Sequence, residues 1–120
     1  MAHPVVHFEI AGPDLEKTRA FYGELFGWRA DEQMPGYAMV ETGTDVGIKG
    51  GLMRAPEGAP PYVTVYVEVE DLEGYLDKAE ILGGKTIVER MPIPGFGAFA
   101  MFADPDGNVI GLFETKGATQ

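Results

Sequence analysis

The sequence of 120 residues is long enough for one domain with a hydrophobic core, and its formal net charge is −10. This acidity disfavours nucleic-acid binding, which depends on Lys and Arg neutralising phosphates, and the absence of cysteine excludes disulfides, thiolate metal sites and a cysteine nucleophile. Because no run of about 18 apolar residues occurs, we expect a cytoplasmic protein without membrane or nucleic-acid partners.

The first elements follow from alternation and helical spacing. Residues 4–10 predict a strand because apolar and polar side chains alternate along them. A helix is expected from Asp14 to Leu25, since Asp14 is a good N-cap and apolar residues follow at helical spacing. Gly27 is expected to end this helix. Two strands are predicted next, over about residues 37–42 and 46–53.

The pattern restarts after a proline-rich stretch. Residues 54–61 contain three prolines and no periodicity, so we interpret them as a connector inside one domain. A strand with four valines on one face is predicted over residues 62–69, and Asp71 is expected to begin a second helix that Gly83 and Gly84 end. Three further strands are predicted, over about residues 85–90, 98–103 and 108–114.

The two halves of the chain resemble each other at a shift of 57 residues. Asp14-Leu15-Glu16 matches Asp71-Leu72-Glu73, and Leu25 matches Leu82. A repeat that is present in only two copies favours a paired structure over a solenoid. The sequence therefore predicts module one over residues 4–53 and module two over residues 62–115, within a single domain of residues 1–120.

Each predicted helix must cover one face of its sheet. The valine face of residues 62–69 is therefore expected under the second helix, and Val6, Phe8 and Ile10 under the first. The opposite faces are either the lining of a cavity with a few polar groups or a solvated sheet surface, and both interpretations stay open here. Their side chains are His7, Glu9, Tyr62, Thr64, Tyr66 and Glu68.

A tight turn joins the last two predicted strands. In Asp104-Pro105-Asp106-Gly107, the first Asp can bond forward to the backbone, Pro sets φ, and Gly tolerates a positive φ. The strand that follows ends on Glu114, whose carboxylate is either solvated or a ligand that points into a cavity.

Three stretches resemble the vicinal oxygen chelate superfamily, which includes glyoxalase I, extradiol dioxygenases and bleomycin-resistance proteins. They are residues 5–10, 14–28 and 102–114. The resemblance implies an α+β fold in which two βαβββ modules form a cupped, partly open mixed barrel around a small-molecule cavity. It also implies a homodimer.

The resemblance implies metal ligands on the first and last strands of each module in metal-dependent members. His7 and Glu114 match two of these four positions, whereas Thr64 and the segment Gly50–Leu52 do not. A divalent metal (Zn, Ni, Mn or Fe) is therefore one alternative, and no cofactor is the other. Without metal, His7 and Glu114 could still act as an acid–base pair.

The resemblance implies binding of a small-molecule ligand in the cupped cavity. One hypothesis adds metal-assisted lyase, isomerase or dioxygenase chemistry at His7 and Glu114. The alternative is a metal-free protein that binds or sequesters a small molecule, as resistance proteins do, so whether the chain is an enzyme stays open. The residues predicted to line the cavity are Glu9, Thr64, Tyr66, Phe96 and Met101.

Overall fold

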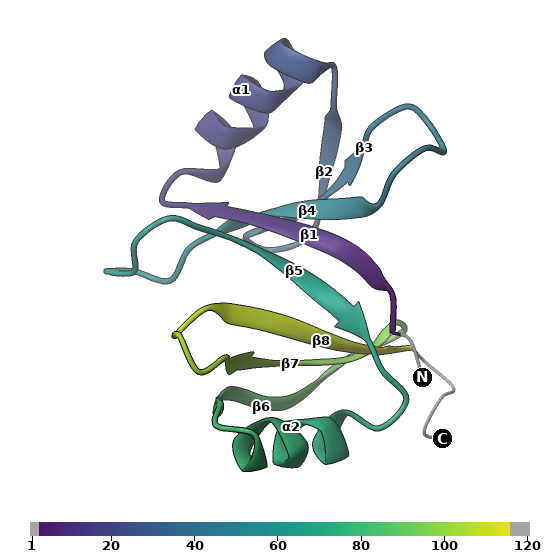
Figure 1. Ribbon diagram of the computed structural model, residues 1–120. Helices are drawn as coiled ribbons and strands as arrows, with labels where there is room; N and C mark the ends of the chain where they lie inside the picture. Colours follow the sequence, from purple (N-terminus) through teal and green to yellow (C-terminus); the bar gives the residue numbers. More distant parts are fainter. Residues whose placement is uncertain (1–2, 116–120) are drawn as a thin grey trace. The chain divides into compact units, whose positions relative to one another are not determined.

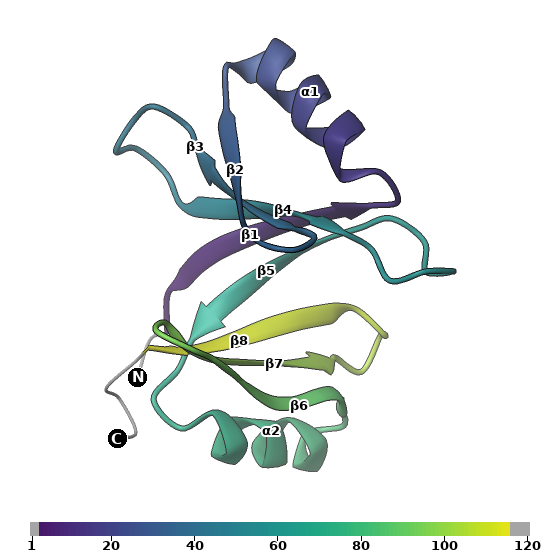
Figure 2. The ribbon, with the colours of Figure 1, turned by 180° about the vertical axis from the view of Figure 1, so that it is seen from behind.

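The computed structural model describes residues 3–115, which form two compact units (Figure 1, Figure 2). The first unit contains residues 7–64, and the second contains residues 3–6 and 65–115. Along the chain, a strand, a helix and three strands occur in that order and then occur again. The predicted α+β class with two βαβββ modules is therefore confirmed. No helix in the described part is long and apolar enough to cross a membrane.

The first module has the strand order β2-β3-β4-β1. Strand β1 pairs in parallel with β4, while β3 is antiparallel to both β4 and β2. Its elements are β1 (Val5–Gly12), α1 (Leu15–Phe26), β2 (Arg29–Met34), β3 (Tyr37–Glu41) and β4 (Lys49–Arg54).

The second module repeats this topology, with the strand order β5-β8-β7-β6. Strand β5 pairs in parallel with β8, and β7 is antiparallel to both β8 and β6. Its elements are β5 (Tyr62–Glu68), α2 (Leu72–Ile81), β6 (Lys85–Ile93), β7 (Gly97–Ala103) and β8 (Val109–Thr115).

Both helices begin as the sequence predicts. The side chain of Asp14 accepts a hydrogen bond from the backbone N–H of Lys17, and Asp71 accepts one from Gly74. Helix α1 ends at Gly27, which adopts a φ of +74° that glycine tolerates without steric cost.

Each helix packs on one face of its own sheet. In the first module Leu15 of α1 is buried with Val40 and Leu52, and Phe8 and Ile10 pack against them as predicted. In the second module α2 covers a core that includes Val67 as a partly buried member. The buried residues of that core are Val69, Leu72, Leu76, Ala98, Ala100 and Leu112.

Two sequence expectations about burial are wrong, and one strand is missed. Val63 is 70% exposed, because the helix packs near the end of β5 rather than along its whole valine face. Phe21 and Leu25 are 58% exposed, so the apolar stripe of α1 is wider than the face it buries. Strand β2 is not predicted, since its sequence is polar and mostly exposed, as suits an edge strand paired only on one side.

The predicted turn after β7 is confirmed. Oδ1 of Asp104 accepts hydrogen bonds from the backbone N–H groups of Asp106 and Asn108, and Gly107 has a φ of +95°. These bonds, those from Asn108 foremost, lower the pKa of the Asp104 carboxyl group. Asp104 is therefore a turn-forming residue.

Candidate functional site

Four polar side chains of the first unit form one hydrogen-bonded group, which we call the Glu9 network: His7, Glu9, Tyr37 and Tyr62. The Nε2 atom of His7 lies 2.7 Å from the hydroxyl oxygen of Tyr37. Tyr37 also hydrogen-bonds Glu9, and the Tyr62 hydroxyl donates to Oε2 of Glu9 at 2.7 Å. On β1, His7 and Glu9 alternate with the residues that face α1, so the network lies on the face of this sheet opposite α1.

Burial and hydrogen bonding shift the pKa values of three groups in this network, His7, Tyr37 and Tyr62. Glu9 is only 3% exposed, and the two tyrosine hydroxyls solvate its carboxylate in place of water. Burial raises the pKa values of Tyr37 and Tyr62, and the hydrogen bond and negative charge of Glu9 raise them further. Burial lowers the pKa of His7, so its imidazole is neutral near pH 7.

The proton positions follow from this hydrogen bonding. Tyr37 has one hydroxyl proton, and a tyrosine can bond a carboxylate only as a donor. That proton is therefore directed to Glu9 in the hydrogen bond that raises the Tyr37 pKa, while the imidazole tautomer sets the direction of the bond between Tyr37 and Nε2 of His7. The network thus runs from His7 through Tyr37 to the buried side chain of Glu9.

Two adjacent glycines of β4 make room for this arrangement. A Cβ atom at Gly51 would lie 2.3 Å from the hydroxyl oxygen of Tyr37, and one at Gly50 would lie 2.3 Å from ring atoms of Phe8. Successive residues of a strand face opposite sides of the sheet. The Gly-Gly pair therefore admits one aromatic ring on each face, and Gly51 is what lets Tyr37 reach Glu9.

Replacing Gly51 by alanine is expected to displace Tyr37 from the network and to lower the free energy of unfolding by about 1–3 kcal/mol, because the new methyl group overpacks the site. Gly12→Ala is the matched control, since its Cβ would meet only Thr18 Oγ1 at 3.5 Å, an ordinary contact. Urea unfolding measures both changes. Equal stability of the two variants would contradict the role given to Gly51.

Ultraviolet titration of the five tyrosines is expected to show at least two phenols, those of Tyr37 and Tyr62, that ionise later than an exposed tyrosine, whose pKa is about 10. A pKa raised in the folded state means that the neutral phenols stabilise the protein below about pH 10, and that this stabilisation is lost as the pH rises towards the folded values. Tyr37→Phe and Tyr62→Phe should each remove one late phenol. A single ionisation common to all five tyrosines would contradict the network.

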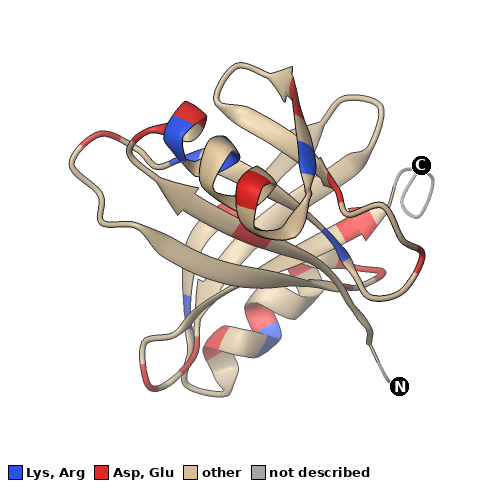
Figure 3. Ribbon diagram, turned by 90° about the horizontal axis from the view of Figure 1, so that it is seen from above, with Lys and Arg blue, Asp and Glu red and all other residues tan. Residues whose placement is uncertain are grey.

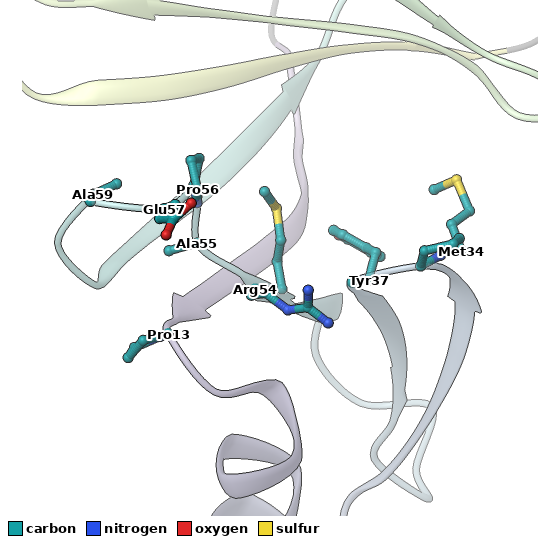
Figure 4. A pocket seen from close by; sticks show the side chains of 12 residues that line it. Pro13, Met34, Tyr37, Arg54, Ala55, Pro56, Glu57 and Ala59 are labelled. Carbon is teal, nitrogen blue, oxygen red and sulfur yellow. The ribbon is translucent and has the colours of Figure 1, made fainter.

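A pocket of about 680 Å³ shares residues with the network. Tyr37 lines it, and so does Met53, whose sulfur lies 3.6 Å from the Tyr62 hydroxyl. Figure 4 shows side chains of the segment after β4 on one side of the pocket and Met34 and Tyr37 on the other. Charged groups from Arg54 and Glu57 complete its lining. Apolar walls with a few polar groups are typical of small-molecule sites.

The structure joins His7 and Glu9 to Tyr62, which the sequence also placed on a polar strand face. It adds Tyr37 and Met53, which are not among the predicted site residues. The alternation of residues 62–69 placed Tyr62 on the polar face, but nothing in the local pattern paired it with Glu9. The burial of Glu9 excludes the alternative of a solvated sheet surface at this position.

The remaining predicted cavity residues are placed as follows. Thr64 is buried. In the second unit Tyr66 is buried against Phe99, and its ring fills the space where a side chain at Gly111 would lie. Met101 is buried on β7. Phe96 is 57% exposed, in the turn between β6 and β7.

Glu114 is engaged in contacts inside the second unit. Its Oε2 atom accepts a hydrogen bond from Arg90 Nη2 at 2.8 Å, and its Oε1 atom accepts one from the backbone N–H of Leu72 at 3.2 Å. Leu72 is the first residue of α2, where negative charge is favourable. This bond with Glu114 raises the pKa of Arg90. Glu114 therefore ties the end of β8 to α2 and to β6.

The donor set does not fit a catalytic divalent metal. In the part of the chain that the structure describes, no three His, Cys, Asp or Glu side chains are grouped so as to hold an ion. Such centres use at least three protein ligands, and both Thr64 and the Gly50–Leu52 segment lack a carboxylate or imidazole. His7 bonds Tyr37, while Glu114 bonds Arg90. The assignment of His7 and Glu114 as ligands or as a catalytic pair stays a prediction.

The family model of the Glyoxalase/Bleomycin resistance protein/Dioxygenase superfamily matches residues 5–112. The chain belongs to this superfamily. The putative glyoxylase CFP32 of Mycobacterium tuberculosis is 31% identical over 110 residues, which cover 86% of this chain and 42% of the relative. The anthracycline biosynthesis protein DnrV of Streptomyces peucetius is 30% identical over 117 residues, which cover 83% of this chain and 42% of the relative. The chain spans about two fifths of the length of these curated relatives.

Solved structures of the superfamily share the fold. The Mn(II)-bound glyoxalase from Novosphingobium aromaticivorans matches with a TM-score of 0.63 at 20% sequence identity, over 94% of this chain and 40% of that one. The resemblance to glyoxalases and dioxygenases inferred from the sequence is therefore confirmed at the level of the superfamily, which includes metal-binding proteins.

Proposed function

We propose that this superfamily member binds a small organic molecule in the pocket beside the Glu9 network and does so without a resident metal ion. One observation carries the proposal: two residues that line the pocket also touch the network, because Tyr37 hydrogen-bonds His7 and the Met53 sulfur lies 3.6 Å from the Tyr62 hydroxyl. The network fixes polar groups at one wall, while Met34 and neighbouring prolines supply apolar walls. This combination favours a ligand with a large apolar body and a few polar atoms.

The ligand class that we propose is a planar polycyclic aromatic compound that carries a positive charge. Flexible thioethers such as those of Met34 and Met53 adapt to aromatic surfaces. Asp and Glu outnumber Lys and Arg by 19 to 9 and occur in helices and loops alike (Figure 3), which favours cations. The name of the relative DnrV, an anthracycline biosynthesis protein, supports the same class.

A binding experiment with a cationic anthracycline and an uncharged anthraquinone tests the proposal. Bound ligand at about 100 times its Kd should stabilise the protein by about 2.7 kcal/mol in thermal or urea unfolding, and the cationic compound should bind more tightly. Ala59→Trp, which fills the pocket, should abolish the effect. Ala20→Trp on the exposed side of α1 is the control. Equal stabilisation of both variants, or none of the wild type, would contradict this function.

We also infer that the protein is a cytoplasmic homodimer. The inference is supported by the superfamily resemblance and by exposed apolar side chains on α1, which are Phe21, Leu25 and Phe26. Light scattering at micromolar concentration should give twice the mass of one chain, and a monomer would contradict the dimer.

A further inference from the structure

A second cavity, of about 350 Å³, lies in the other unit, under helix α2. We call it the α2 cavity. The helix contributes Tyr75 and Ala79, which are four residues apart and therefore on one face. The sheet contributes Val67 of β5, Phe102 of β7 and Leu112 of β8, and Val69 follows directly after β5. The walls are almost wholly apolar, and the volume is that of a small-ligand site.

One cationic side chain at this cavity can pair with an anion. Lys78 of α2 lines it, with Nζ 5.8 Å from the centre of the Tyr75 ring. His3 also lines it, with Nε2 2.8 Å from the Tyr75 hydroxyl. Asp104 also lines the cavity, and its carboxylate accepts three hydrogen bonds inside its own turn. Lys78 is the only Lys or Arg among the described residues that line the cavity, in a chain where such residues are scarce.

We propose that the α2 cavity binds a small apolar molecule that carries one carboxylate. The hydrocarbon part lies among Val69, Phe102 and Leu112, where burial of about 25 cal/mol per Å² of apolar surface drives binding. The carboxylate lies at the mouth beside the ammonium group of Lys78. The α2 cavity shares no lining residue with the pocket beside the Glu9 network. Evidence against one of the two binding proposals therefore does not count against the other.

Methyl NMR with octanoate as the probe tests the proposal. Octanoate should shift the methyl signals of Val69 and Leu112, while those of Leu52, buried in the core of the first unit, should stay unchanged. Octan-1-ol, which has the same chain and no charge, should shift the same signals with weaker affinity. Equal shifts at Leu52, or no shift at Val69 and Leu112 at millimolar octanoate, would overturn the proposal.

Two variants separate the apolar and the ionic contributions. Ala79→Phe fills the cavity and should abolish binding of both probes, whereas Ala20→Phe on the exposed side of α1 should not. Lys78→Met should weaken the binding of octanoate about three- to five-fold, as expected for the loss of a partly exposed ion pair. The affinity for octan-1-ol should stay unchanged. Lys17→Met on α1 is its control. If Ala79→Phe fails to fold, the Lys78→Met variant still tests the proposal. An equal loss of affinity for octanoate and octan-1-ol, or no loss for either, overturns the proposal.

Discussion

Replacing Glu9 by alanine is expected to lower the free energy of unfolding by about 2–4 kcal/mol. The residue is 3% exposed, and its carboxylate accepts hydrogen bonds from two tyrosines. Without it, the hydroxyls of Tyr37 and Tyr62 lose their acceptor while they stay largely buried, and a cavity opens beside them. Urea unfolding at pH 7 measures the loss.

Two further variants make the Glu9 result specific. Glu41→Ala removes an exposed carboxylate from β3 of the same unit and should change stability by no more than about 0.5 kcal/mol. Glu9→Gln keeps one acceptor oxygen and should recover part of the loss. A Glu9→Ala loss no larger than that of Glu41→Ala would show that the network contributes nothing to the fold.

Replacing Glu114 by alanine is expected to lower the free energy of unfolding by about 2–4 kcal/mol as well. The buried carboxylate of Glu114 binds Arg90 and the first backbone N–H of α2, at Leu72, so its removal leaves both donors without this partner. Amide exchange in the first turn of α2 should accelerate. Glu89→Ala, at an exposed position of β6, should neither lower the free energy of unfolding to this extent nor accelerate amide exchange in α2. Unchanged exchange in α2 would contradict the contact with Leu72.

Metal titration distinguishes this structural role from a ligand role for the same residue. Mn(II) is expected to bind wild type, His7→Ala and Glu114→Ala with the same weak affinity, because no three His, Cys, Asp or Glu side chains of the described residues are grouped so as to hold an ion. Isothermal titration at fixed ionic strength measures the affinities. Binding at least ten-fold tighter to wild type than to both variants would instead support the metal-assisted hypothesis.

Much of the fold could be predicted from short stretches of sequence. Asp14 and Asp71 cap their helices as their side-chain chemistry requires, and Asp104 forms the turn before β8. Strand β2 and the exposure of Val63 could not be predicted, because a polar edge strand has no apolar period and alternation does not say how far a helix reaches along a sheet.

The sequence by itself determined the duplicated βαβββ order, the capping residues and the superfamily, since each depends on residues close together in the chain. It also placed His7 and Glu9 on one strand face. Only the tertiary structure decided their partners. Glu9 meets Tyr62 across 53 positions of sequence, and it meets Tyr37 because Gly51 leaves room for a hydroxyl group. Such contacts depend on strand register and on the space left by a missing side chain, which no local pattern encodes.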